Sequence, residues 1–257
     1  MSNIALNLLR PTLANHEVII FISEQVGKKG GGVDAISLLE QKLPCELIFP
    51  MLEALGKPLD GSYYTFKQVE EYDGIPISTP TNINNEEGIN RIKEFAPDLI
   101  IAIRYGQIFK EEIISIPKHG IINLHSGILP DYKGILSTFQ AMLNDEKQAG
   151  CTLHYITDPS IDTGSIINLH TIPIDKNKPL IWHVSQLYNG GIKMLENAID
   201  SLAVGKPIAA TTQDTSKGKY SSYPNKAELD SFYDKGYKLF DSNCYMEIMN
   251  LYFKKNK

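Results

Sequence analysis

The chain has 257 residues, of which 42% are hydrophobic and 21% charged, with 25 Lys and Arg against 30 Asp and Glu. This length permits one large domain, or one domain with a small appendage, and a core that needs no disulfide or metal for stability. The net charge of −5 is a poor electrostatic match for a polyanion, so we expect no nucleic-acid partner with a large footprint.

Cysteine usage and the N-terminus predict a soluble cytoplasmic protein. Cys45, Cys151 and Cys244 lie far apart with no paired spacing, which indicates reduced thiols and no zinc or other metal site. The apolar stretch 4–9 is interrupted by Asn7 and lacks the basic leader of a signal peptide. No apolar run approaches the ~20 residues that span a bilayer, so we expect no membrane partner.

Short apolar runs alternate with helical spacing along the first two-thirds of the chain. The runs rich in β-branched residues predict buried strands at 18–22, 46–49, 99–103 and 121–124. Apolar residues at helical spacing predict helices over 35–43 and 87–95. Further strands are expected at 151–156 and 166–174, followed by a helix over 179–204 that Gly205 ends. This order predicts an α/β fold with a mostly parallel sheet and helices on both of its faces.

A change in composition follows Gly205, where apolar periodicity is lost until an aromatic-rich tail begins. We therefore expect a catalytic domain over 1–205 and a small appendage over 206–257 that contacts substrate or forms a homodimer interface. Most of the tail's aromatic rings are expected to pack a small core of their own.

A glycine-rich segment, Gly27–Gly32, follows the first predicted strand. Gly30, Gly32 and Ala35 fit the relaxed dinucleotide-binding pattern, and two neighbouring lysines would favour a phosphate. Short Gly-x-Gly matches are common, so a phosphate site and a surface loop both stay open.

The chemistry-bearing stretch begins at the end of the strand 121–124. Asn123 and His125 are two residues apart, so both side chains project to one side of the sheet, at the carboxyl end where ligands bind. An Asn amide can donate to a developing oxyanion, and a His can donate to the same oxygen or carry a proton. Asp162, in a turn before a strand, is the candidate carboxylate that would orient the imidazole. With no Ser or Cys nucleophile beside them, these three predict direct acyl transfer between two bound substrates.

Several motifs in this stretch resemble the 10-formyltetrahydrofolate-dependent formyltransferases. They are Asn-Leu-His-Ser-Gly-Ile-Leu-Pro-Asp-Tyr-Lys-Gly from Asn123, Gly-Cys-Thr-Leu-His from Gly150, and Asp-Thr-Gly from Asp162. The resemblance covers roughly 96–174 and weakens before Glu87. It implies a Rossmann-like domain with the family triad at Asn123, His125 and Asp162.

The resemblance also implies that 10-formyltetrahydrofolate is the co-substrate and that its pterin lies between 104–108 and 157–162, largely against main-chain groups. Ile108 would supply an apolar wall. The implied folate-binding residues are Arg104, Tyr105, Gly106, Gln107, Ile108, Thr157, Asp158 and Ile161. His154 is expected to pack or hydrogen-bond within its strand rather than to act in catalysis.

Among acceptors known for this family, a nucleotide-linked (dTDP- or UDP-) amino sugar for surface polysaccharide, or O-antigen, synthesis is the main expectation. The chain is short and acidic for the tRNA-specific enzyme. Arg104 and Lys133 could meet a diphosphate, and Tyr220 or Tyr223 could face a base. Glycinamide ribonucleotide is the alternative acceptor, and hydrolysis of the folate is an alternative reaction. A non-catalytic module that binds folate or a nucleotide sugar is the alternative outside enzymes.

Overall fold

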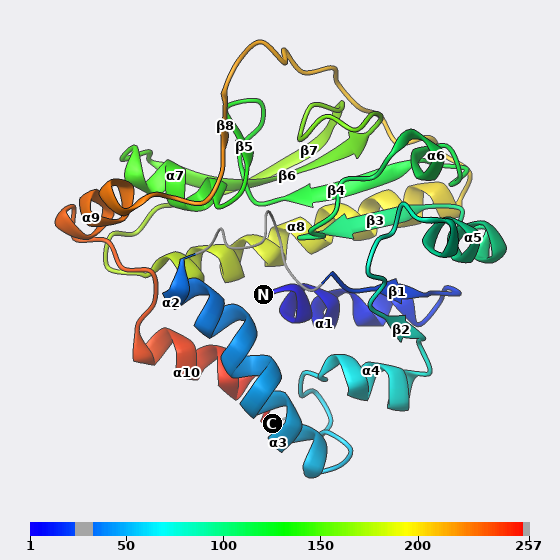
Figure 1. The fold of residues 1–257 in the computed structure, drawn as a ribbon, viewed down its shortest axis with the longest axis horizontal. Coiled ribbons are helices and arrows are strands. Elements are labelled where there is room, and N and C mark those ends of the chain that lie inside the picture. The colour runs from blue at the N-terminus through cyan, green and yellow to red at the C-terminus, as the bar shows by residue number, and fades with distance from the viewer. Residues whose placement is uncertain (24–32, 254–257) are drawn as a thin grey trace.

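The computed structural model describes residues 1–23 and 33–253 and confirms the α/β class (Figure 1). The predicted Gly27–Gly32 site lies outside the described residues. The helices are α1 (Ser2–Leu13), α2 (Asp34–Ser37), α3 (Phe49–Ala54), α4 (Phe66–Asp73), α5 (Glu86–Phe95), α6 (Glu111–Ile114), α7 (Ser137–Leu143), α8 (Leu180–Ala203), α9 (Lys226–Asp234) and α10 (Ser242–Asn250), with wider π turns at η1 (Leu38–Lys42) and η2 (Pro44–Ile48). The strands are β1 (Ile20–Phe21), β2 (Ile77–Ser78), β3 (Ile100–Ile103), β4 (Ile121–His125), β5 (Tyr132–Gly134), β6 (Gln148–Ile156), β7 (Ile166–Pro173) and β8 (Lys219–Ser221).

The largest sheet has four strands in the order β3-β4-β6-β7. β3 and β4 are parallel, as predicted, with Ile100 opposite Ile121. β4 pairs with β6, and β6 with β7, in antiparallel fashion. This sheet is therefore mixed rather than mostly parallel, because β6 and β7 are consecutive and adjacent, and the short connection between them can join only antiparallel strands. β1–β2 and β5–β8 form two separate parallel pairs.

The long helix α8 covers one face of this sheet. It packs against β6, β7 and α1 (Figure 1), and it buries Leu187 and Leu195 in the main core. At Gly191 an added Cβ would come within 2.9 Å of the Leu124 side chain, so glycine lets α8 lie close to β4. The helix predicted over 179–204 is confirmed, and Gly205 follows it with φ +72°. No helix in the described part of the chain is long and apolar enough to cross a membrane.

The strand predicted at 46–49 is wrong. Residues 34–54 instead form one run of helical turns, α2, η1, η2 and α3, which we call the N-terminal helical arm (Figure 1). Pro44 occupies the first turn of η2, where a proline is tolerated. A four-residue segment with three apolar side chains fits a strand or one side of a helix equally well, and here the segment continues a helical run.

The C-terminal segment 206–257 packs against the rest of the chain within its described part. β8 pairs with β5, which places Tyr220 opposite Lys133. Phe232 and Tyr237 are buried in the main core, where the Phe232 ring stacks on Phe139 with centroids 4.5 Å apart. Several aromatic rings of the tail therefore complete the main core rather than a separate one. The domain boundary at Gly205 stays a prediction.

Candidate active site

β4 supports two of the three predicted catalytic side chains. It is an inner strand, bonded to β3 on one side and β6 on the other, and Asn123 and His125 occupy alternate positions near its carboxyl end. The His125 side chain is 7% exposed. A Cβ at Gly127 would lie 2.4 Å from His125 Nε2, so only glycine leaves room for this ring orientation.

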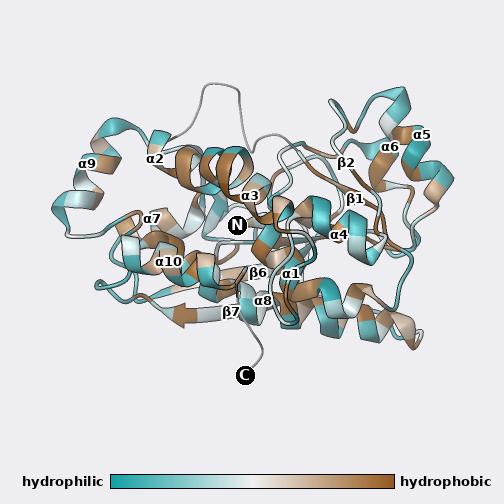
Figure 2. Ribbon diagram, turned by 90° about the horizontal axis from the view of Figure 1, so that it is seen from below, coloured by the Kyte–Doolittle hydropathy of each residue, from teal (hydrophilic) through white to brown (hydrophobic). Residues whose placement is uncertain are grey.

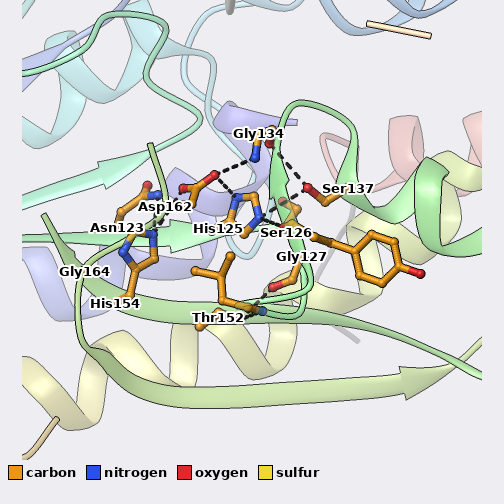
Figure 3. A network of polar contacts seen from close by, with 12 residues as sticks. Asn123, His125, Ser126, Gly127, Gly134, Ser137, Thr152, His154, Asp162 and Gly164 are labelled. Carbon is orange, nitrogen blue, oxygen red and sulfur yellow. Dashed lines mark hydrogen bonds and ion pairs between the residues drawn. The ribbon is translucent and has the colours of Figure 1, made fainter. Parts of the chain in front are cut away.

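Asp162 lies between two histidine rings (Figure 3). Its Oδ2 is 3.4 Å from His125 Nδ1, and its Oδ1 is 3.3 Å from His154 Nε2. The Gly134 N–H of β5 donates to the same Oδ2 at 2.7 Å. The structure thus brings together Asn123, His125 and Asp162, and it adds His154, which the sequence analysis assigned to packing.

Hydrogen bonds to the main chain fix one proton on each histidine. His125 Nε2 lies 2.7 Å from the Tyr132 carbonyl oxygen and His154 Nδ1 lies 2.8 Å from the Tyr155 carbonyl oxygen. Because a carbonyl only accepts, each of these nitrogens must donate. The other ring nitrogen of each histidine faces Asp162. A second proton on either ring would therefore point toward the carboxylate.

Burial and charge oppose each other at these groups. Burial lowers the pKa of His125 below its usual value, and the Asp162 carboxylate limits this effect. Burial would raise the pKa of the Asp162 carboxyl, but the charge of His125, the neighbouring His154 ring and the hydrogen bond from the Gly134 N–H hold it below its usual value. Asp162 is consequently charged at neutral pH, and burial favours the neutral form of His125.

His154 also orients Asn123. The Asn123 Nδ2 lies 3.1 Å from His154 Nε2. An Asn amide nitrogen carries two hydrogens, so this bond uses one and leaves the other for a ligand. Both ring nitrogens of His125 are already engaged, so donation from Nε2 to an oxyanion would require exchange of its bond to Tyr132. The geometry therefore favours Asn123 as the oxyanion donor and His125 with Asp162 as the proton-handling pair.

Side chains of β6 and α7 hold the loop after β4 in place. The Thr152 hydroxyl donates to the Gly127 carbonyl at 2.6 Å and accepts from the Leu129 N–H at 3.1 Å. Ser137 Oγ lies 3.3 Å from His125 Nε2. These contacts fix the loop that carries the Tyr132 carbonyl and the Gly134 N–H. Main-chain groups of this kind leave no residue-type signal in a sequence.

A pocket at the carboxyl ends of β3 and β4 joins this cluster to most of the predicted folate-binding residues. Of those residues, the ones that line it are Arg104, Tyr105, Gly106, Gln107, Ile108, Asp158 and Ile161, whereas Thr157 does not. Ile108 is 53% exposed and Ile161 is 39% exposed, so two apolar side chains are available at the pocket. The Gln107 side chain is committed to the segment before α5, because its Oε1 accepts from the Ile83 N–H at 2.7 Å.

The predicted diphosphate residues are both engaged by protein groups. Arg104 follows β3 with φ +53° and forms an ion pair with Glu40 of the helical arm. Its charge is therefore already paired with a carboxylate of the protein. Lys133 is buried, does not line the pocket, and donates to the Thr215 and Lys217 carbonyls at 2.9 and 2.8 Å. This geometry gives Lys133 a structural role, contrary to the predicted diphosphate contact.

Tyr220 and Tyr223 both line the same pocket. Tyr220 is 55% exposed, and its ring lies against Gly134, where an added Cβ would come within 2.8 Å of it. This places an accessible aromatic face beside the loop that contacts Asp162. Among residues 1–23 and 33–253, no group of three or more His, Cys, Asp or Glu side chains is arranged to hold a metal ion.

Comparison with known proteins identifies the segment that carries this site. Residues 60–187 match the family model described as formyl transferase. The chain is similar to methionyl-tRNA formyltransferase of Syntrophomonas wolfei subsp. wolfei, with 32% identity over 162 residues, 63% of this chain and 51% of that protein. The corresponding enzyme of Kosmotoga olearia is 32% identical over 176 residues, 68% of this chain and 56% of that protein. The chain spans about half the length of the curated relatives it matches.

Solved structures share the fold. One is the sugar 3N-formyl transferase WlaRD, solved with dTDP and 5-N-formyl-THF, with a TM-score of 0.51 and 24% identity over 80% of this chain and 70% of that chain. Another is HypX from Aquifex aeolicus in complex with tetrahydrofolic acid, with a TM-score of 0.53 and 17% identity over 83% of this chain and 31% of that chain. The range that matches the family model, 60–187, spans the positions of Asn123, His125 and Asp162. The segment 60–187 of this chain therefore belongs to the formyl transferase family.

Proposed function

We propose that this protein transfers a formyl group from 10-formyltetrahydrofolate to the amine of a nucleotide-linked amino sugar. The observation that carries the proposal is the Asp162 carboxylate, which lies 3.4 Å from His125 Nδ1 and 3.3 Å from His154 Nε2 beside the Asn123 amide. Such a set can stabilise an oxyanion and move a proton, and these are the two tasks of acyl transfer to an amine.

The pocket suits a folate. A pterin is a flat ring with amide-like edges, so it needs apolar walls and main-chain hydrogen-bond partners. Ile108 and Ile161 can supply the walls, and the main chain of 104–108 runs along the pocket. The Tyr105 hydroxyl is buried without a partner among the described residues, which leaves a polar atom near this segment for a ligand or water.

The reaction assigns a separate task to each residue. The amine nitrogen attacks the formyl carbon, and the second Asn123 N–H donates to the carbonyl oxygen as that oxygen gains negative charge. His125, paired with Asp162, takes up the proton that the amine loses, directly or through water. As the bond from carbon to the folate nitrogen breaks, His125 returns a proton to that nitrogen. Asp162 stays charged throughout and stabilises the imidazolium.

Two features support a nucleotide-linked sugar as the acceptor. The exposed Tyr220 ring borders the pocket and offers a face on which a base can stack. The net charge of −5 disfavours a large polyanion. A specific observation favours a second candidate, methionyl-tRNA, because the curated relatives reported above are methionyl-tRNA formyltransferases. Glycinamide ribonucleotide is the third candidate, because the glycine-rich segment could bind its phosphate.

An acceptor panel tests the proposal. The purified chain is mixed with 10-formyltetrahydrofolate and, in turn, dTDP- and UDP-linked amino sugars, glycinamide ribonucleotide, methionyl-tRNA or no acceptor, and tetrahydrofolate release is followed by absorbance. We expect release with an amino sugar and formylated sugar in the product. Release with methionyl-tRNA alone would reassign the acceptor, and release without acceptor would indicate hydrolysis. Folate binding without release would indicate a binding module.

Tyr220→Ala sharpens the choice of acceptor. Loss of base stacking should raise KM for the nucleotide sugar about tenfold while kcat stays near the wild-type value. Tyr233→Ala is the matched control, because Tyr233 is 48% exposed on α9 and does not line the pocket. An unchanged KM in Tyr220→Ala would remove the proposed base contact.

A further inference from the structure

Gln213 reaches the active site from outside the segment that matches the family model. It follows α8, and its side chain is buried, with the residue 7% exposed. Its Nε2 donates to the Asp162 carbonyl oxygen at 3.0 Å and to the Gly164 carbonyl oxygen at 2.6 Å. Two residues earlier, Thr211 exchanges main-chain hydrogen bonds of 2.7 and 2.8 Å with Ile166 at the start of β7, which fixes this segment beside the Asp162 loop.

The Asp162 loop needs such support. Asp162 has φ +57°, a left-handed conformation that residues other than glycine seldom adopt and that the surroundings must hold in place. On its other side the loop is in tight contact with β6, since a Cβ at Gly164 would lie 1.9 Å from the Tyr155 carbonyl oxygen. The loop is thus held between the β6 main chain and the Gln213 amide.

We propose that Gln213 is a positioning residue for the formyl transfer proposed above, and the inference rests on that function. Its amide holds the main chain of Asp162 so that the carboxylate stays between His125 and His154. One amide nitrogen has two hydrogens, which match the two carbonyls it meets. Gln213 acts through Asp162 and has no contact of its own with the reacting atoms.

The amide chemistry can be removed without removing the volume. Gln213→Met keeps the length of the side chain but donates nothing, so two buried carbonyls lose their partner. Gln213→Glu places a carboxylate oxygen against one or both carbonyls, which repels them. Both variants should let Asp162 move while leaving the walls of the pocket intact.

Gln68 provides a matched control that does not line the pocket. It is also buried, and its Nε2 donates to the Leu52 and Gly56 carbonyls at 3.3 and 3.0 Å. Gln68→Met should therefore lower the melting temperature at least as much as Gln213→Met, with kcat unchanged.

The experiment combines kinetics with an NMR titration of the His125 ring in the full chain. In Gln213→Met and Gln213→Glu we expect kcat to fall roughly 10- to 100-fold, with KM for both substrates within about threefold. The pKa of His125 should also fall, because Asp162 is the charge that raises it.

The outcomes are separable. A kcat within twofold of wild type together with an unchanged His125 titration would overturn the inference. A fall in kcat with an unchanged titration would also overturn it, since the loss of activity would then not come from a displaced Asp162 carboxylate. If the wild-type chain transfers no formyl group, the proposed function fails, and the titration alone then decides whether Gln213 positions Asp162.

Discussion

The four-stranded sheet buries polar side chains at the candidate site, whereas the N-terminal helical arm exposes apolar side chains. At the carboxyl end of β4, the buried polar groups of His125, His154 and Asp162 contact one another and the main chain of neighbouring elements. Along the arm and just after it, large apolar side chains are exposed, and brown residues mark α3 in Figure 2. These are Leu38, Leu47, Met51, Leu55 and Leu59, which are 49–75% exposed.

The difference shows where each region gets its structure. In the arm, Phe49 and Leu52 are buried, and the Phe49 and Tyr252 ring centroids lie 5.8 Å apart. The site is held from several directions by hydrogen bonds and ion pairs. We therefore expect substitutions at the site to change the rate of catalysis whether or not the side chain is buried. Substitutions along the arm should change the free energy of unfolding according to how deeply the side chain is buried.

His125→Ala should have the largest effect. Losing the ring removes the proton carrier and the partner of Asp162, so kcat for formyl transfer should fall by roughly 10²- to 10⁴-fold. His119→Ala, at a half-buried histidine that does not line the pocket, is the control. Steady-state rates measure both variants. A kcat of His125→Ala within fivefold of wild type would show that the buried polar groups of the site are not needed for catalysis.

Leu52→Ala and Leu55→Ala compare a leucine of the arm that is 7% exposed with the leucine just after the arm, which is 75% exposed. Loss of buried contacts should reduce the free energy of unfolding of the first by about 2–5 kcal/mol. The second should stay within about 0.5 kcal/mol of wild type. Urea denaturation measures both, and equal effects would show that another surface covers Leu55.

Gly134→Ala and Gly56→Ala compare two glycines with positive φ, +91° and +83°. A Cβ at Gly134 would lie 2.2 Å from the Ser221 carbonyl oxygen, whereas nothing lies within 4 Å of one at Gly56. Gly56→Ala should cost about 1 kcal/mol of stability from backbone strain alone. Gly134→Ala should cost about 1–3 kcal/mol and also lower kcat, since its N–H donates to Asp162. Wild-type kcat in Gly134→Ala would contradict that second role.

The smallest effect is on the pH dependence of stability. The folded chain keeps His125 and His183 neutral below their ordinary pKa of 6.5, whereas the unfolded chain takes up protons there. Unfolding therefore binds protons, and the free energy of unfolding should decrease as pH falls below about 6.5. Asp162, with its pKa held below 3.8, stays charged in both states until lower pH. Urea midpoints from pH 8 to pH 5 should fall less steeply in His125→Gln than in His16→Gln, and equal slopes would count against the buried neutral ring.

The sequence predicted the central part of the molecule well. The strands at 99–103 and 121–124 and the helix at 179–204 were found because their patterns are long or bounded by clear signals such as Gly205. The spacing of Asn123 and His125 fixed their common side of the sheet. The short run at 46–49 failed because it has no period long enough to separate a strand from a helix.

Contacts made by the main chain or by a distant segment could not be predicted from the sequence. Lys133 read as a free cation, but the pairing of β5 with β8 buries it against two carbonyls. Gln213 lies in a stretch without apolar periodicity, and its distance of 51 residues from Asp162 leaves no local signal. His154 was underrated because its role depends on β4 and β6 being antiparallel neighbours, which places it opposite Asn123.

The most direct test of the account is the single-turnover rate of formyl transfer in Asp162→Asn. This change keeps the shape of the side chain but removes the charge that faces His125. We expect a rate roughly 10²- to 10⁴-fold below wild type with folate affinity within about threefold, while Asp214→Asn, at an exposed carboxylate next to Gln213, keeps the wild-type rate. An Asp162→Asn enzyme that transfers the formyl group within fivefold of the wild-type rate would contradict the account.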